Sequence, residues 1–294
     1  MVALALDIGA TKFAAGTVDS DGTVRGARRI AVPASGVWDA CRELLLDVAA
    51  GDEVTAVGIG SAGPVDVRTG TTGPINIPEW AGGFDVVAAV GELFPGAMIR
   101  FTIDGDCLAL AEQRWGAARG VRDFLALTVS TGIGGGIVAD GRVVVGRTGN
   151  AGHLGHIVVP GNEEPCACGG FGCVEAVASG PSSVRWARRQ GWTGESGVEL
   201  AEAARAGDGI ALAALHRAGS ALGTAVASAA ALLDTDLVVI GGGFAQSGEA
   251  LWEPLRATVA VHARLRFLDE LRVVPSELTD QATLAGAGLL ALGG

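Results

Sequence analysis

The chain has 294 residues, enough for two domains with substantial cores. Hydrophobic residues make up 49% of it and charged residues 18%, a balance that excludes an intrinsically disordered chain. A net charge of -11 argues against a protein that binds nucleic acid through its phosphates. The sequence shows neither an uncharged apolar span of 18 residues nor a basic, cleavable N-terminal leader, so we expect a cytoplasmic protein without membrane contact.

The first predicted elements are strands joined by short turns. An apolar run over residues 2–8 predicts a buried strand, and the Asp-Gly pair at residues 21–22 predicts a turn between two further strands. The first two strands are joined by DIGATK, residues 7–12, which is rich in groups suited to a ligand.

Four residues of this first turn are candidates for binding a phosphorylated cofactor. Gly9 lets the backbone approach a ligand, while Thr11 and Lys12 offer a hydroxyl and a cation to phosphate oxygens. Asp7 is a candidate ligand of hydrated Mg²⁺, which prefers few carboxylates and several waters. A turn with a structural role only is the alternative.

Strands and helices then alternate up to the middle of the chain, which predicts α/β layers. In chain order we predict a helix over 37–50, a strand over 54–60, a Gly- and Pro-rich loop over 61–80, a helix ending near 93, a strand over 97–103 and a helix over 107–116.

Asp104 stands between a predicted strand and a predicted helix. Aspartate is favoured as a helix N-cap, which would give Asp104 a structural role. A carboxylate at a strand end is also where a general base for a substrate hydroxyl would lie. The two roles are compatible. Asp106 is closer to the predicted helix and is a candidate for the cap, which would leave Asp104 free.

A second segment, residues 124–145, repeats the opening pattern of strand, Gly- and Thr-rich turn, strand, Asp-Gly turn and strand. This repeat predicts two halves of like construction. Its turn, STGIGGG, contains Thr131 and Gly132, lacks the P-loop order of residues, and does not lead into a helix as a dinucleotide-binding turn does. We expect the two turns to clamp a triphosphate, with unrelated structural turns as the alternative.

Three cysteines and a histidine lie close together in the second half. Cys166, Cys168 and Cys173 have C-x-C-x4-C spacing, and His156 precedes them by ten residues. Three thiolates and one imidazole complete a tetrahedral zinc site and leave no position for a catalytic water, so we predict a structural zinc. The alternative is chance thiols or a disulfide, although nothing in the sequence suggests an oxidising compartment.

The predicted zinc loop would place His153, His156 and Glu175 beside a substrate pocket. His216 and His262 lie in helical stretches without partner ligands and are expected to be surface or structural residues.

The rest of the chain is predicted to be helical up to residue 233, and a strand then leads into a third glycine cluster. This cluster includes Gly241 and Gly242 and would suit a nucleotide base or ribose lying against bare backbone. A strand over 271–274 and a closing helix over 282–292 follow. We predict one domain over residues 1–118 and another over 119–294, with the closing helix packing back on the first.

These pieces together resemble the ROK family of sugar kinases and repressors, over nearly the whole chain. DIGATK and STGIGGG resemble its two phosphate motifs, VVIGGG its adenosine-side loop, and CACGGFGCVE fits its C-x-C-G-x-x-G-C-x-E signature at every fixed position. The resemblance implies an α/β fold with two actin-like (ribonuclease H-like) domains that close an interdomain cleft over a hexose and MgATP. It also implies transfer of the γ-phosphoryl group to a sugar hydroxyl, usually the 6-hydroxyl, by a homodimer or homotetramer.

Individual roles follow from the resemblance by position. Asp104 matches the catalytic base, and His156 matches the zinc-bound histidine that also borders the sugar. Glu175 matches a carboxylate hydrogen-bonded to the sugar, and Gly63 falls in the loop that lines the sugar site.

Two positions depart from the family pattern. Ile103 stands where an asparagine is common, and His153 where a glutamate is common. Loss of a hydrogen-bonding group can change hydroxyl selectivity by orders of magnitude. An N-acetylated, differently configured or deoxy hexose fits these changes at least as well as glucose.

Two other functions remain as alternatives to a kinase. The departures at Ile103 and His153 are compatible with a sugar-binding regulator that has lost catalysis. A transcriptional repressor is disfavoured, because family repressors carry an N-terminal helix-turn-helix domain, whereas the first predicted strand begins here at Val2.

Overall fold

A computed structural model describes residues 1–278 and 281–293 of the chain. They divide into two compact units. The first unit contains Met1–Gly120, Gly136–Gly152 and the described residues from Glu277 onward, and the second contains Val121–Gly135 and His153–Ser276. The domain boundary at residues 118 and 119 stays a prediction.

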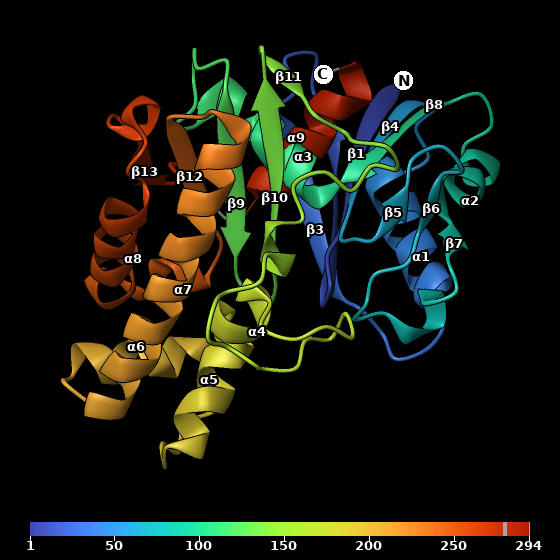
Figure 1. The fold of residues 1–294 in the computed structure, drawn as a ribbon. Coiled ribbons are helices and arrows are strands. Elements are labelled where there is room, and N and C mark those ends of the chain that lie inside the picture. The colour runs from blue at the N-terminus through green and yellow to red at the C-terminus, as the bar shows by residue number, and fades with distance from the viewer. Residues whose placement is uncertain (279–280, 294) are drawn as a thin grey trace. The chain divides into compact units, whose positions relative to one another are not determined.

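The first sheet has the strand order β3-β2-β1-β4-β8 (Figure 1). Strand β2 is antiparallel to both of its neighbours, β1 and β3, whereas β1, β4 and β8 run parallel. The apolar runs and the Asp-Gly turn therefore form the elements that the sequence predicted. The strands are β1 (Val2–Ile8), β2 (Lys12–Val18), β3 (Val24–Ala31), β4 (Val54–Ser61) and β8 (Met98–Ile103).

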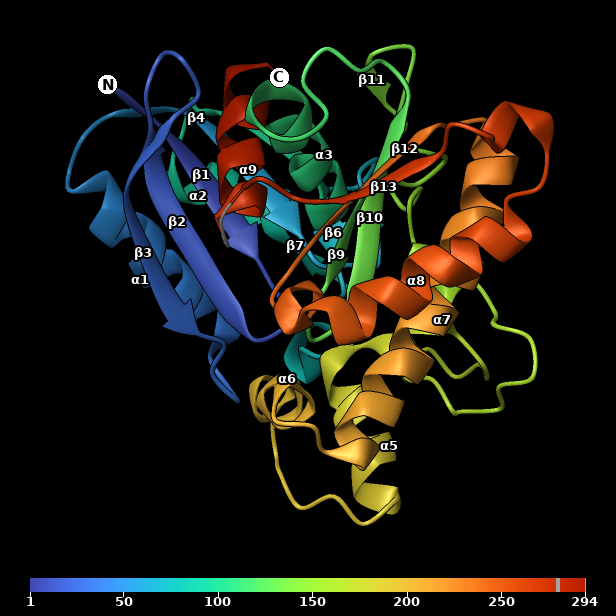
Figure 2. The same ribbon diagram turned by 90° about the vertical axis from the view of Figure 1, so that its left-hand side faces the viewer.

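Strand β1 is central, and nearly all of it is apolar because both faces of the sheet are covered. Its even-numbered residues from Leu4 to Ile8 face helix α1 (Val37–Ala49), whereas its alanines face helix α9 (Ala282–Leu292). Figures 1 and 2 show these helices on opposite faces of the sheet. A β-carbon at Gly58 of β4 would collide with the backbone of α9, so glycine permits this close packing.

The predicted loop over residues 61–80 contains regular structure instead. Strands β5 (Val65–Asp66), β6 (Thr71–Thr72) and β7 (Phe84–Asp85) form a small sheet. Its short strands carry too few residues for a periodic pattern to reveal them. The remaining helices of the first unit are η1 (Pro78–Trp80), α2 (Val86–Leu93) and α3 (Asp104–Trp115).

The second sheet, in the order β11-β10-β9-β12-β13, follows the same plan as the first. Strand β12 runs parallel to β9 and β13, and β10 is antiparallel to β11. The two halves of like construction thus appear as a shared strand order. The strands are β9 (Phe124–Val129), β10 (Ile133–Ala139), β11 (Arg142–Val143), β12 (Leu237–Gly241) and β13 (Arg272–Pro275).

Helix α7 (Gly209–Leu233) is the longest in the described chain and packs against α8 (Glu249–His262). Side chains at Gly219 and Gly223 would collide with or crowd the backbone of α8, so these glycines let the two helices approach closely. By length and composition α7 could cross a membrane, but 61% of its apolar window is buried, as in a core helix. The other helices of the second unit are η2 (Leu154–His156), α4 (Val174–Ala178), α5 (Gly180–Arg189), α6 (Gly197–Arg205), η3 (Phe244–Ser247) and η4 (Arg266–Leu268).

Candidate active site and metal centre

Asp7 and Asp104 meet at one end of the first sheet. Asp7 on β1 pairs with Gly60 on β4, which in turn pairs with Thr102 on β8, two residues before Asp104. A β-carbon at Gly60 would lie 3.7 Å from the Cα atom of Asp104. The glycine between them therefore brings the two carboxyl groups into the same small space.

Burial changes the acidity of both groups. It raises the pKa of Asp104 to about 6, although the backbone N–H of Gly105, 2.8 Å from Oδ1, works in the opposite direction. Burial and the charge of Asp104 raise the pKa of Asp7 to about 7, and the nearby cations Lys12 and Arg29 oppose this rise. Both carboxyls thus titrate in a range suited to proton transfer near neutral pH.

The cap role considered for Asp106 is wrong. Helix α3 begins at Asp104, and its N-cap, Ile103, has no side-chain hydrogen bond to the helix. Asp106 is buried and accepts a hydrogen bond from the Thr102 hydroxyl through Oδ2, while its Oδ1 atom has no hydrogen-bond partner in the described chain. Burial raises the pKa of Asp106 to about 7, which favours its neutral form in mildly acidic solution.

The first Gly-rich turn and the loop after β4 lie in the same unit as this acid cluster. The N–H of Gly9 donates to the carbonyl of Lys12 over 3.0 Å, and Thr11 and Lys12 are exposed at the tip. Gly63 is half-buried and precedes Pro64 across a cis peptide bond.

Ile103 lies at the end of β8, beside the start of the loop that contains Gly63. It pairs in register with Ser61 and is almost fully buried. The Ser61 and Thr72 hydroxyls lie 2.7 Å apart and fix the start of this loop. Position 103, where the family pattern commonly has an asparagine, therefore carries a buried apolar side chain.

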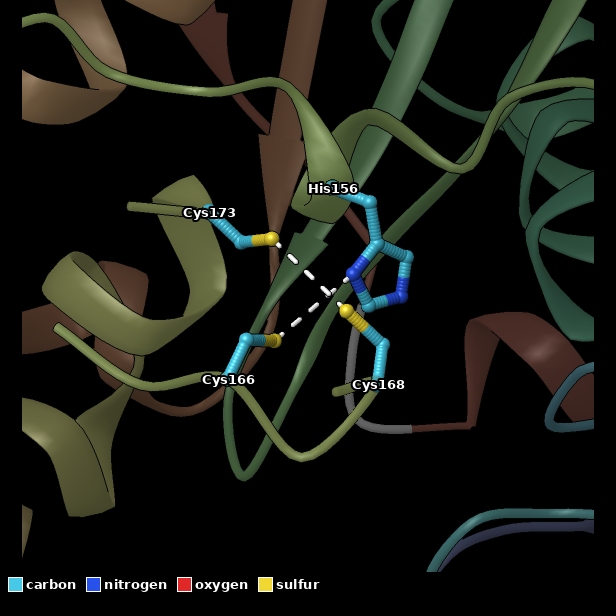
Figure 3. Close-up of side chains that lie close together, drawn as sticks. All are labelled: His156, Cys166, Cys168 and Cys173. Atoms are coloured by element: carbon cyan, nitrogen blue, oxygen red, sulfur yellow. Dashed lines mark hydrogen bonds between the residues drawn. The ribbon is translucent and has the colours of Figure 1, made fainter. Parts of the chain in front are cut away.

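The second unit contains the cysteine cluster, whose four side chains point toward one another (Figure 3). The possible ligand atoms of His156, Cys166, Cys168 and Cys173 all lie within 4.8 Å of one another. The Sγ atoms of Cys168 and Cys173 are 3.8 Å apart, and Cys166 Sγ is 3.8 Å from His156 Nδ1. Tetrahedral zinc with roughly 2.3 Å bonds to sulfur requires sulfurs about 3.8 Å apart, so this donor set fits zinc.

Backbone pairing shapes the loop that carries these cysteines. The N–H of Cys166 donates to the carbonyl of Gly170 over 2.8 Å, and the N–H of Gly172 donates to that of Glu164 over 2.8 Å. Gly169 and Gly172 have φ values of +90° and +71°, which glycine adopts without strain. The glycines of the CACGGFGC segment thus let the chain fold back, so that the three thiols lie close together.

Glu175 connects this loop with the second Gly-rich turn. It lies in α4, two residues after Cys173, and its Oε2 atom accepts a hydrogen bond from the N–H of Ile133 over 2.7 Å. A side chain at Gly132 would crowd the same oxygen at 2.7 Å. Thr131 is exposed at the tip of this turn. Glu175 therefore holds a backbone group of the turn, a contact that the sequence did not predict.

The third glycine cluster lies beside the end of β9. Gly241 ends β12 and pairs with Thr128, and Gly242 has a φ of +96°. A β-carbon at Gly242 would lie 2.5 Å from the carbonyl oxygen of Val129, so glycine alone fits there.

The four histidines separate into two groups. The rings of His153 and His156 stack with centroids 5.8 Å apart and planes at 19°. His216 and His262 are exposed on α7 and α8, as the sequence predicted.

A duplicated α/β sheet, Gly-rich turns after the first strand of each half and a Cys3His loop define the class of protein. The ROK family model matches residues 3–293, and the chain belongs to the ROK family. The predicted family and the predicted α/β fold of actin-like halves are thereby confirmed.

Individual relatives match this chain over nearly their whole length. The chain is 35% identical to a glucokinase of Thermotoga maritima, covering 97% of this chain and 95% of that protein. It is 33% identical to an N-acetylmannosamine kinase of Escherichia coli O157:H7, covering 100% and 99%. A ROK glucokinase from Streptomyces griseus, solved with glucose and AMPPNP, superposes with a TM-score of 0.86 at 31% identity and covers both chains fully. At the level of enzyme class, the predicted sugar kinase is confirmed.

Proposed function

We propose that this protein transfers the γ-phosphoryl group of ATP to a hydroxyl of a hexose or hexose derivative, with the 6-hydroxyl as the expected acceptor. The observation that carries the proposal is Asp104, a half-buried carboxylate at the start of α3 whose pKa is raised to about 6. The names of the relatives above support the same chemistry.

In this proposal Asp104 is the general base. Its carboxylate accepts the proton of the attacking sugar hydroxyl as the new oxygen–phosphorus bond forms. A base with a pKa of about 6 is mostly ionised at neutral pH, yet it is basic enough to take the proton. The rate should therefore fall as the pH drops below about 6, where Asp104 becomes protonated.

The Gly-rich turns and Asp7 would bind the nucleotide and its Mg²⁺. Backbone N–H groups of both turns, together with Thr11, Lys12 and Thr131, would bind phosphate oxygens, and Gly241 and Gly242 would accommodate the adenosine. Asp7 would hold Mg²⁺, and the residues fit, because the raised pKa of Asp7 marks a buried carboxyl that a cation would stabilise in its ionised form. Bound Mg²⁺ would neutralise phosphate charge.

The Cys3His cluster is proposed to bind structural zinc. The donor atoms, their spacing and the closed set of four ligands fit this metal. Zinc would fix the loop and, through α4, the position of Glu175. Metal analysis of the purified protein tests this directly, and Cys168→Ser should lose the metal.

The identity of the sugar depends on two positions. Ile103 is a buried apolar residue directly before Asp104, and His153 stacks on His156. These two departures support an N-acetylated hexose, which is the substrate named for one group of relatives. Glucose, named for another group, is the alternative that the sugar panel tests. The double variant Ile103→Asn, His153→Glu should shift preference toward glucose.

ADP release with MgATP and a panel of hexoses, N-acetylhexosamines and deoxy sugars tests the activity. Turnover that depends on one sugar would support the kinase and identify its substrate. Sugar binding without ADP release would favour the regulator that has lost catalysis. If glucose is the best substrate of the unmodified protein, the role assigned to Ile103 and His153 is wrong. Cytoplasmic location and assembly into a dimer or tetramer remain proposals, the latter testable by light scattering.

A further inference from the structure

Arg217, on helix α7, reaches the loop that precedes the cysteines. One amino group of its guanidinium donates to the Asn162 side-chain oxygen and to the Glu164 carboxylate, each over 3.2 Å. The other donates to the carbonyl of Val177 over 2.8 Å. Three segments that are distant in sequence therefore meet at one side chain.

Each of these contacts lies within four residues of a proposed metal ligand in the sequence. Glu164 precedes Cys166 by two residues, and its carbonyl accepts the N–H of Gly172, the neighbour of Cys173. Val177 lies in α4, the short helix that begins directly after Cys173. Arg217 thus holds both sides of the loop that carries the three thiols.

The surroundings of Arg217 restrict its motion. Its side chain is 19% exposed, and its guanidinium lies over the ring of Trp186, 5.7 Å from the centroid. Glu164 is 22% exposed and forms a second ion pair with Arg189. A planar group with several fixed donors suits such a junction, whereas lysine would supply only a point charge.

We propose that Arg217 is a positioning residue for the metal centre, which fastens the cysteine loop and the end of helix α4 to helix α7. The inference rests on the zinc site proposed above, but it does not require that the protein be a kinase. Groups that hydrogen-bond directly to metal ligands typically change metal affinity by about 10- to 100-fold when removed. Arg217 acts one step further out, through Glu164 and Val177, so we expect an effect at the lower end of this range. Loss of Arg217 should loosen the thiols and speed metal release.

The test compares zinc release to a chromogenic chelator from wild-type protein and from the variants Arg217→Met and Arg217→Lys. We expect release to be about tenfold faster from Arg217→Met, with partial rescue in Arg217→Lys. Arg256→Met is the matched control, because Arg256 also pairs with a glutamate, Glu249, and lies over a tryptophan ring, but on α8. This control should release zinc at the wild-type rate.

A second variant and a spectroscopic measurement separate metal positioning from general stability. Glu164→Gln weakens the same junction from the loop side without touching α7, and it should also speed release. Cobalt-loaded Arg217→Met should show altered thiolate-to-metal bands, while circular dichroism stays at the wild-type level. Wild-type release rates in both Arg217→Met and Glu164→Gln would overturn the proposal. Absence of metal from the wild-type protein would instead overturn the zinc site itself, and this role with it.

Discussion

The two sheets share one strand order, yet the residues at the ends of their central strands differ in chemical character. In the first sheet, Asp7 on the central strand lies opposite Gly60 of the neighbouring parallel strand. In the second, the corresponding central strand places Thr128 opposite Gly241. The fold thus repeats the positions of side chains without repeating their charge.

This difference suits the two sheets to different roles in the proposed reaction. The first sheet gathers carboxyl groups with raised pKa values, which suit proton transfer and Mg²⁺. The second offers a hydroxyl and bare glycine backbone, which suit phosphate and nucleotide groups. In the proposed function, the two copies of the scaffold therefore contribute different groups to one reaction, because their strand ends have diverged.

The largest expected effect comes from removing the base of the first sheet. Asp104→Asn keeps the shape of the side chain but cannot accept the sugar proton, so kcat should fall by about 10²- to 10⁴-fold. Sugar affinity, measured by calorimetry, should change by only a small factor. Asp52→Asn, at an exposed position, is the control. A kcat within tenfold of wild type would remove Asp104 from the base role.

Placing a carboxylate at the corresponding position of the second sheet should weaken ATP binding. Thr128→Asp puts a negative charge beside Gly242, where a phosphate or ribose is proposed to bind, and a cost of about 3 kcal/mol would raise the KM for ATP about a hundredfold. Thr128→Val changes the shape equally little and adds no charge, so its KM should rise far less. Equal KM values for the two variants would contradict this reading of the second sheet.

Asp7→Asn should change the pH dependence of stability. Folding raises the pKa of Asp7 from 3.8 to about 7. Between about pH 4 and pH 7, Asp7 therefore holds a proton in the folded protein that it loses in the unfolded chain. The stabilising contribution is therefore full below about pH 4 and is lost as the pH rises through about 7. Urea unfolding without Mg²⁺ or nucleotide should show Asp7→Asn to be nearly equal to wild type at pH 4 and more stable at pH 8 by about 2 kcal/mol. This is about half of the roughly 4 kcal/mol that the change in pKa implies, because Asp7 is partly exposed to solvent. Parallel pH curves would contradict the raised pKa.

The smallest effect is expected at the contact between α4 and the second turn. Glu175→Gln removes the charge from the hydrogen bond that Ile133 donates, at a cost of about 1.5 kcal/mol, and should raise the KM for ATP about tenfold. Zinc content should not change. Glu163→Gln, at an exposed position in the loop before Cys166, should behave like wild type. A change confined to the KM for sugar would favour the sugar-binding role predicted for Glu175.

The sequence was informative where the signal is local. Apolar runs, Asp-Gly turns and the cysteine spacing identify the strands, the repeat and the Cys3His cluster, because each is a short pattern with a direct physical cause. Contacts across the fold were not predictable in this way. Arg217 lies 53 residues from Glu164 in sequence, and no periodicity marks it as a partner of the cysteine loop. The bond from Thr102 to Asp106 was missed because a helix-capping role looked equally natural.

The first unit is discontinuous in the chain, and this has a consequence for protein synthesis. Helix α9 covers the face of β1 and β4 that carries alanine and glycine, yet it follows the whole second unit in sequence. The ribosome makes β1 early and α9 more than 270 residues later. Until α9 is made, that face of the sheet lacks part of its cover, so the first unit is expected to complete its fold after the second.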